Sequence, residues 1–187
     1  MVMKTLLKNG LGIIVMVFAV TVFFSCESNF KEVQRINSVA FAPSGEADTV
    51  DLKYTDSGKV KAILVSPKML DYSNAKYPFT EFPKGIHVTL FDDDQKKSYV
   101  DADYAITYAK TDIIDLQGNV KITSSDGKLL QTEQLYYDQK NEWFFTEKQF
   151  KYTDEAGGYL EGPGVDFSKD FKVFNMQNSR GEVTKLE

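Results

Sequence analysis

The sequence has little of the chemistry on which most catalytic and metal sites depend. Its 187 residues include one histidine and one cysteine. The histidine, His87, lies between Ile86 and Val88 in a strand-like pattern, where an ordinary imidazole is far more common than a catalytic base or a metal ligand. The acidic run 92–94 lacks the spaced oxygens and the glutamate of a calcium loop, and no nucleophile lies in a recognisable elbow sequence. We therefore expect no enzymatic activity, no cofactor and no metal site.

Positive charge is also scarce. The chain has 22 Lys and Arg against 27 Asp and Glu, a net charge of −5. Two of the lysines, Lys4 and Lys8, precede an N-terminal apolar run, so the chain without residues 1–25 has 20 basic and 27 acidic groups, or −7. Because nucleic-acid-binding proteins carry basic patches, we expect no nucleic acid partner.

The lone cysteine follows an apolar run that is too short for a membrane-spanning helix. Leu11–Phe24 carries no charge and is followed by Ser25-Cys26, whereas a spanning helix needs about 20 apolar residues. The stretch resembles a bacterial lipoprotein signal peptide of the loose form found in the Bacteroidetes lineage, which implies lipid on the cysteine. We predict a cleaved signal peptide over 1–25 and a lipid anchor on Cys26, for which the chain offers no disulfide partner. The alternative is an uncleaved helical anchor that begins near Thr5.

Downstream of the anchor, the pattern predicts a short tether and one domain. Residues 26–48 are polar and irregular, with Pro43-Ser44-Gly45 near their end. Residues 49–187 are long enough to bury a core without metals or disulfides. Helical periodicity is absent after Val39, and either kind of anchor would keep this domain outside the cytoplasm.

The domain begins with a predicted hairpin. Residues 49–55 alternate between apolar and polar side chains, 56–59 form a turn, and 60–65 form the second strand. Pro67 is expected to end that strand, because proline cannot donate to a strand ladder. Residues 73–84 hold two prolines among aromatics and are expected to be a loop over the sheet, and 85–91 form another strand.

The centre of the domain, 111–138, predicts short strands joined by glycine turns. Gly118-Asn119 and Asp126-Gly127 are the expected turns, since such pairs supply positive φ values. A weak internal repeat of about thirty residues relates 103–108 to 133–138 and, less closely, to 162–167. Paired-strand repeats cannot bury their apolar faces alone, so they must stack into one sheet that curls on itself.

These residues carry a resemblance to a known family. The pattern contains an acidic residue with a later tyrosine, a Leu-x-Gly-Asn-Val-x-Ile segment, and an Asp-Gly-x-x-Leu-x-Thr-Glu-x-Leu-x-Tyr-Asp segment. It is met by Asp103, Tyr108, Leu116, Gly118, Asn119, Val120, Ile122, Asp126, Gly127, Leu130, Thr132, Glu133, Leu135, Tyr137 and Asp138. It resembles the OstA-like domain of lipopolysaccharide-transport proteins, and with its N-terminal anchor the chain is most similar to the LptC family, over about Val50 to Val183.

The resemblance implies an open, twisted antiparallel β-jellyroll, a boat- or V-shaped double sheet whose apolar interior holds acyl chains. It implies a periplasmic protein, anchored at the inner membrane, in a lipopolysaccharide transport bridge. The implied partners are lipopolysaccharide through its lipid A acyl chains, an inner-membrane ABC transporter, and an LptA-like periplasmic bridge protein.

Aromatic side chains crowd the last third of the chain, and two interpretations of them remain open. They either line a lipid-accessible groove or fill the sealed core of a lipid-anchored interaction module. For the groove, the residues expected to share one face are Tyr108, Leu116, Ile122, Leu135, Trp143, Phe145 and Phe150.

The two ends of the sheet are the expected partner-binding edges. Residues 171–177 form an apolar, proline-free strand candidate near the C-terminus, which suits β-augmentation by a neighbouring jellyroll. The alternative is that this strand closes the sheet internally. The residues expected at the two edges are Leu52 and Leu64 in the N-terminal hairpin, and Lys172, Phe174 and Asn175 near the C-terminus. The resemblance implies that the first edge faces the transporter and the second the next bridge protein.

Overall fold

The computed structural model describes residues 42–182 of the chain. They belong to one compact unit. The predicted signal peptide, Cys26 and most of the tether therefore lie outside the described residues. The described residues form strands and no helix, so none of their elements is a helix able to cross a membrane. The prediction of an all-β fold is confirmed.

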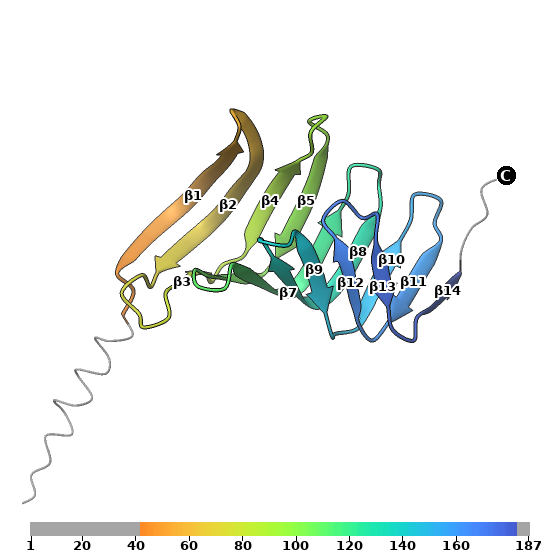
Figure 1. Cartoon of the computed structure of the whole chain (residues 1–187). Helices are drawn as coiled ribbons and strands as arrows, with labels where there is room; N and C mark the ends of the chain where they lie inside the picture. The colour runs from red at the N-terminus through yellow and green to blue at the C-terminus, as the bar shows by residue number, and fades with distance from the viewer. Residues whose placement is uncertain (1–41, 183–187) are drawn as a thin grey trace, which may run out of the picture. The chain divides into compact units, whose positions relative to one another are not determined.

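All strand pairings in this unit are antiparallel, and they join the strands into one folded sheet (Figure 1). The fourteen strands are β1 (Gly45–Asp56), β2 (Lys59–Asp71), β3 (Phe79–Phe82), β4 (Ile86–Phe91), β5 (Lys97–Ala102), β6 (Tyr104–Tyr108), β7 (Ile113–Thr123), β8 (Leu129–Asp138), β9 (Trp143–Thr146), β10 (Phe150–Thr153), β11 (Tyr159–Gly162), β12 (Val165–Ser168), β13 (Phe174–Met176) and β14 (Arg180–Glu182).

The sheet folds into two layers because its longest strands take part in both. The first half of β7 pairs with β6 and its second half pairs with β5, while β8 lies along its other side. We call β1, β2, β4, β5, β10, β11 and β14 the first layer, and β3, β6, β9, β12 and β13 the second layer. Strand β2 also pairs with β4 and then with β3, so β2, β4, β5, β7, β6 and β3 close a ring. This is the double-layered jellyroll that the resemblance implied.

The chain crosses between the layers at corners that recur about every fifteen residues. They fall between β5 and β6, within β7, within β8, between β9 and β10, between β11 and β12, and between β13 and β14. The corners are centred near 103, 118, 133, 148, 163 and 178. Two successive corners return the chain to the same layer, so the pattern repeats about every thirty residues. Each of the three repeats contains a corner and the second-layer segment after it: 103–108, 133–138 and 162–167.

The pair Gly118-Asn119 is a corner and not the hairpin turn that we predicted. Both residues have positive φ, +73° and +46°, and they form an irregularity inside β7 between Gln117 and Val120. An extra residue of this kind bends a strand and increases its twist. The prediction of a turn at Gly118-Asn119 is therefore wrong, although the need for positive φ was correctly recognised; the turn at Asp126-Gly127 is confirmed.

Three expected boundaries in the N-terminal part also differ. Strand β2 continues through Pro67 to Asp71. Pro67 and the opposite residue of β1, Thr49, are left out of the pairing, and Thr49 has a φ of +57°. The ladder therefore resumes beyond the proline. The expected loop 73–84 contains β3, which pairs with β2 and β6. Strand β1 already begins at Gly45, within the stretch expected to be tether.

Candidate functional site

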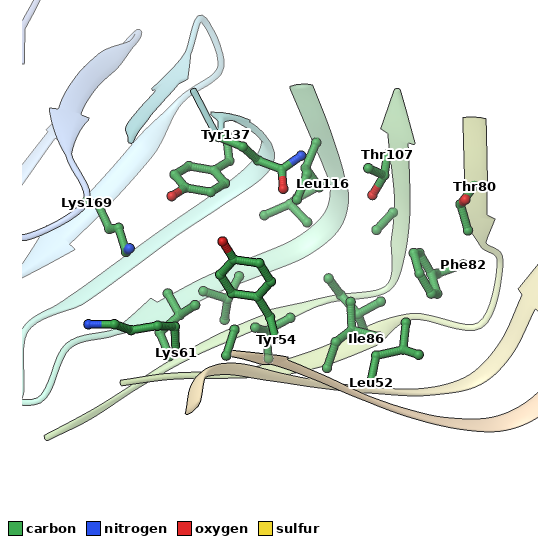
Figure 2. A pocket seen from close by; sticks show the side chains of 18 of the residues that line it. Leu52, Tyr54, Lys61, Thr80, Phe82, Ile86, Thr107, Leu116, Tyr137 and Lys169 are labelled. Carbon is green, nitrogen blue, oxygen red and sulfur yellow. The ribbon is translucent and has the colours of Figure 1, made fainter. Parts of the chain in front are cut away.

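A cavity of about 630 Å³ lies between the two layers in the N-terminal half of the unit (Figure 2). This volume is within the range of about 300–1,000 Å³ that is usual for ligand pockets. Its wall on the first layer contains a cross-strand row of aliphatic side chains: Leu52 pairs with Leu64, Leu64 with Val88, and Val88 with Val100. Paired residues point to the same face of a sheet, so the register aims this row into the cavity.

The opposite wall comes from the second layer and is equally apolar near its base. Phe82 pairs with Ala105, and Ala105 pairs with Leu116. All three side chains line the cavity, and their exposed fractions are 3% or less. The base of the cavity therefore offers hydrocarbon on both sides, which is the environment that an acyl chain needs.

The cavity is open to solvent along β1. Leu52 and Tyr54 face the cavity from this strand, yet they are 46% and 65% exposed. Large apolar side chains on the inner face of a sheet are normally covered. Their exposure shows that the second layer does not cover the inner face of β1 at Leu52 and Tyr54.

Polar groups rim one end of the opening. Tyr54 and Lys61 lie on one wall and Tyr137 and Lys169 on the other (Figure 2). The Lys61 ammonium is 2.6 Å from Asp93 Oδ1, and the Lys169 ammonium is 2.8 Å from Glu142 Oε1. Burial raises the pKa of the Tyr137 hydroxyl to about 12, with smaller contributions from nearby acidic groups and Tyr54. The opening is thus amphipathic, with charged groups above an apolar base.

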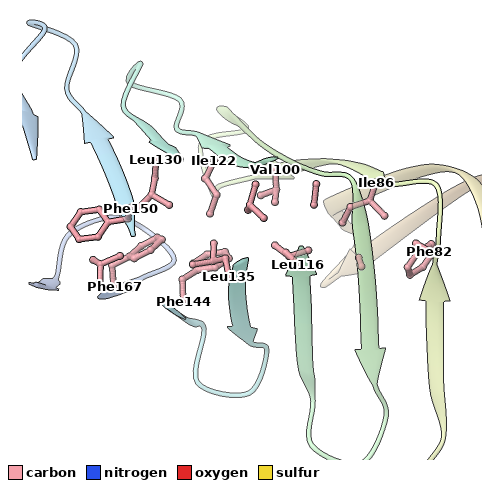
Figure 3. Packing of buried hydrophobic residues seen from close by; sticks show 14 residues of the cluster. Phe82, Ile86, Val100, Leu116, Ile122, Leu130, Leu135, Phe144, Phe150 and Phe167 are labelled. Atoms are coloured by element: carbon pink, nitrogen blue, oxygen red, sulfur yellow. The ribbon is translucent and has the colours of Figure 1, made fainter. Parts of the chain in front are cut away.

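The C-terminal half of the interior is filled by side chains (Figure 3). Phe167 is fully buried, and its ring centroid lies 5.1 Å from that of Phe144 and 5.0 Å from that of Phe174. Phe150 is also buried, at 3% exposure. The C-terminal half therefore has a packed aromatic core. The open cavity lies in the N-terminal half, where aliphatic side chains form part of both walls.

Of the seven groove candidates, Leu116 alone lines the cavity. Ile122, Leu135 and Phe150 point inward but belong to the packed core beside it. The remaining three, Tyr108, Trp143 and Phe145, are on the opposite face of the sheet, so the prediction that all seven share one face is wrong.

The register accounts for this error. Trp143 pairs with Asp138 and Ser168, whereas its neighbour Phe144 pairs with Tyr137 and Phe167. Successive side chains in a strand point to opposite faces. The Trp143 indole donates a hydrogen bond to Asp166 Oδ1 at 3.1 Å on the outer face. Phe145 stacks on Tyr136 there, with centroids 5.2 Å apart.

Cavity residues that the sequence analysis did not single out include Phe82, Ile86, Val88 and Phe144. A usable signal existed in β4, where Ile86, Val88 and Leu90 alternate with polar residues. The signal for β9 was ambiguous, because Trp143, Phe144 and Phe145 are consecutive aromatics. A run of three gives no information on which side chain faces the interior.

The proposed edge residues lie in different environments. Leu52 and Leu64 pair with each other and face the cavity, although β1 itself pairs only with β2 in the described part. Lys172 lies in the turn before β13 and forms an ion pair with Asp170 at 2.8 Å. The hydrogen bond that Lys172 donates lowers the pKa of Asp170 to about 2. Phe174 packs on the core, and Asn175 donates a hydrogen bond to Asp166. The expected strand is shorter than predicted, and β14 follows it.

The other polar candidates lie on the surface. His87 Nδ1 is 2.6 Å from Asp101 Oδ1, and both side chains are half exposed. Residues 92–94 fall in the turn between β4 and β5. Among the described residues, no group of three or more His, Cys, Asp or Glu side chains is arranged to hold a metal ion.

Comparison with known proteins supports the resemblance. Residues 12–182 match the family described as "Lipopolysaccharide-assembly, LptC-related". No curated protein matches the chain. Since the match covers most of the chain, the protein belongs to the LptC-related family and has a role in lipopolysaccharide transport.

Proposed function

We propose that this protein receives lipopolysaccharide from an inner-membrane ABC transporter, holds its acyl chains between the two layers, and passes it to an LptA-like bridge protein. In this proposal the chain is not an enzyme. It works in the periplasm, held at the inner membrane by lipid on Cys26. An uncleaved N-terminal helix would serve the same purpose.

The observation that carries this proposal is the open cavity with an aliphatic base. Exposing an acyl chain of about twelve methylenes to water costs about 0.8 kcal/mol per methylene, or roughly 10 kcal/mol. A carrier must offset that cost with a dry surface. The rows from Leu52 to Val100 and from Phe82 to Leu116 supply such a surface on both walls.

The free strands suggest how the bridge is built. Within 42–182, β1 pairs only with β2, β13 only with β12, and β14 only with β11. Unpaired edges can accept a strand from another sheet. We propose that the transporter meets the β1 edge and that the next jellyroll meets the edge formed by β13.

The test is site-specific photo-crosslinking to lipopolysaccharide in cells, with neighbouring positions as matched controls. Crosslinkers at Leu64 and Val88, which line the cavity, should capture lipopolysaccharide. Crosslinkers at Val65 and His87, which are adjacent in the same strands and pair on the outer face, should capture little or none. Equal capture at all four positions would contradict a specific groove. Trp143 fluorescence is unsuitable as a reporter, because its indole lies on the outer face.

The second candidate is an interaction module without lipid cargo. It is favoured by the buried aromatic packing of the C-terminal half, where Phe150 is 3% exposed and Phe167 is fully buried against Phe144 and Phe174. Under this candidate the inner and outer positions would both fail to capture lipopolysaccharide, while a crosslinker at Asn175 would still capture a partner protein.

A further inference from the structure

Two lysines from elements far apart in the sequence line the opening of the cavity. Lys61 belongs to β2, and Lys169 lies in the turn between β12 and β13. Both line the cavity, above its apolar base (Figure 2). A long lysine stem can lie along apolar surface while its ammonium reaches water, so both ammonium groups are available at the point where a bound lipid would emerge.

Each lysine is held by one carboxylate, and the two ion pairs influence each other. The hydrogen bond that Lys61 donates to Asp93 is the main cause of the raised pKa of Lys61, and Glu142 adds to it. The hydrogen bond from Lys61 is the main cause of the lowered pKa of Asp93, and Lys169 adds to it. The four groups therefore form one charge cluster that spans both walls of the opening.

The lysines are the less exposed members of this cluster. The side chains of Lys61 and Lys169 are 23% and 34% exposed, against 91% for Asp93 and 63% for Glu142. Ion pairs with such exposed carboxylates contribute little stability. Such weakly paired ammonium groups remain able to bind a dianionic ligand in place of the carboxylates.

We propose that Lys61 and Lys169 bind a phosphomonoester on the headgroup of the lipid whose acyl chains occupy the cavity. The proposal rests on the function proposed above and adds a phosphate subsite to it. The net charge of the chain is −5, so attraction for an anion requires a local pair of cations such as this one. The Tyr54 and Tyr137 hydroxyls at the same end of the cavity are additional donors.

The experiment uses the full-length protein in non-ionic detergent, with the photo-crosslinker at Val88. Crosslink yield is titrated with phosphorylated lipid A and with the same lipid A after enzymatic removal of its phosphates. The protein with both lysines should bind phosphorylated lipid A with an apparent affinity about tenfold higher than dephosphorylated lipid A, as expected for charge-assisted contacts. The variant Lys61→Met/Lys169→Met should lose this preference and bind dephosphorylated lipid A as before, because methionine keeps the apolar stem. The single variants should each lose part of the preference.

The matched control is Lys121→Met/Lys151→Met, which makes the same charge change on the outer face of the first layer. It should keep the preference. The proposal is overturned if Lys61→Met/Lys169→Met retains the full preference at an unchanged urea unfolding midpoint, or if the control loses it equally. It is also overturned if inorganic phosphate, at the concentration of the lipid, abolishes the preference, because the site would then bind free phosphate. If neither form of lipid A crosslinks at Val88, the lipid-carrier function itself fails.

Discussion

At the residue scale, neighbouring side chains in the short strand β9 lie on opposite faces of the sheet. Phe144 stacks on Tyr137 and Phe167 inside the unit, while Phe145 stacks on Tyr136 outside it. Both are aromatic and adjacent, so their hydrophobicity does not distinguish them. Their energetic roles differ because only one of them is shielded from water on all sides.

We expect Phe167→Ala to lower the free energy of unfolding by about 3–5 kcal/mol, as is usual for a buried phenylalanine. Phe167 is fully buried among the rings of Phe144, Phe171 and Phe174. The control Phe145→Ala should cost only about 0.5–1.5 kcal/mol, the typical value of one aromatic pair. Urea unfolding followed by far-UV circular dichroism measures both, and equal losses would mean that the C-terminal core is not sealed.

Tyr137 makes stability depend on alkaline pH. Burial raises its pKa from 10.0 to about 12, so the folded protein holds this proton more tightly than the unfolded chain does. The stabilisation is fully present below pH 10 and is lost as the pH rises toward 12. Urea unfolding between pH 9 and pH 12 should therefore show a shallower loss of stability for Tyr137→Phe than for the unaltered protein. Identical slopes would indicate that Tyr137 is accessible to solvent.

At the scale of elements, the corners decide how the sheet folds over. The corner in β7 is held by Asp103, whose amide donates to the Gly118 carbonyl at 3.0 Å and whose carboxylate accepts a hydrogen bond from the Asn119 side chain at 2.6 Å. A side chain at position 118 would meet Asp103, since an added Cβ would lie 3.0 Å from its Cβ. Glycine is therefore favoured at position 118 for two reasons: the positive φ, and the close approach of Asp103, which lies between β5 and β6.

Comparison of two glycines separates these two requirements. Gly118 and Gly58 have similar φ values, +73° and +76°, but an added Cβ at Gly58 would meet nothing within 4 Å. Gly58→Ala should cost about 1–2 kcal/mol, the penalty of a left-handed backbone. Gly118→Ala should cost at least about 1 kcal/mol more, because of crowding at the corner. Equal losses in thermal or urea unfolding would show that Asp103 moves aside freely.

At the scale of the whole molecule, the ends of the sheet bear on assembly. Deletion of the chain after Asp170 would be a poor test of partner binding, because it removes Phe174 from its contact with Phe167 and so exposes the core. A photo-crosslinker at Asn175, the exposed residue of strand β13, keeps that contact. We expect it to capture an OstA-like bridge protein. The matched position Lys151, in the interior strand β10, should not do so.

The anchor is tested independently of the folded unit. If Cys26 carries the lipid, metabolic labelling with a fatty acid should label the full chain and should be lost in Cys26→Ala. The folded unit in that variant should be released from the membrane fraction. Labelling that survives the substitution, or a mature chain that still begins at Met1, would instead support the uncleaved anchor.

The local pattern of the chain was sufficient to predict the all-β class, the hairpin of β1 and β2, the thirty-residue repeat and the family. These properties depend on alternation and on turn residues, which act over a few positions. The same local signals placed positive φ correctly at residues 118 and 119. They could not distinguish a turn that reverses a strand from a bulge that redirects it, because both use the same backbone conformation.

Tertiary structure alone decided where the interior is open and where it is closed. Cavity walls pair residues as distant in the sequence as Leu64 with Val88 and Phe82 with Ala105, and each of these pairings depends on the register between strands that are not joined by a short turn. A register change of one residue reverses the face of every side chain in a strand, which is why Trp143 and Phe145 were assigned to the groove and lie outside it. Lys61 and Lys169 line the same opening because β2 and the turn after β12 belong to facing layers, and the local alternation of side chains carries no information about this arrangement.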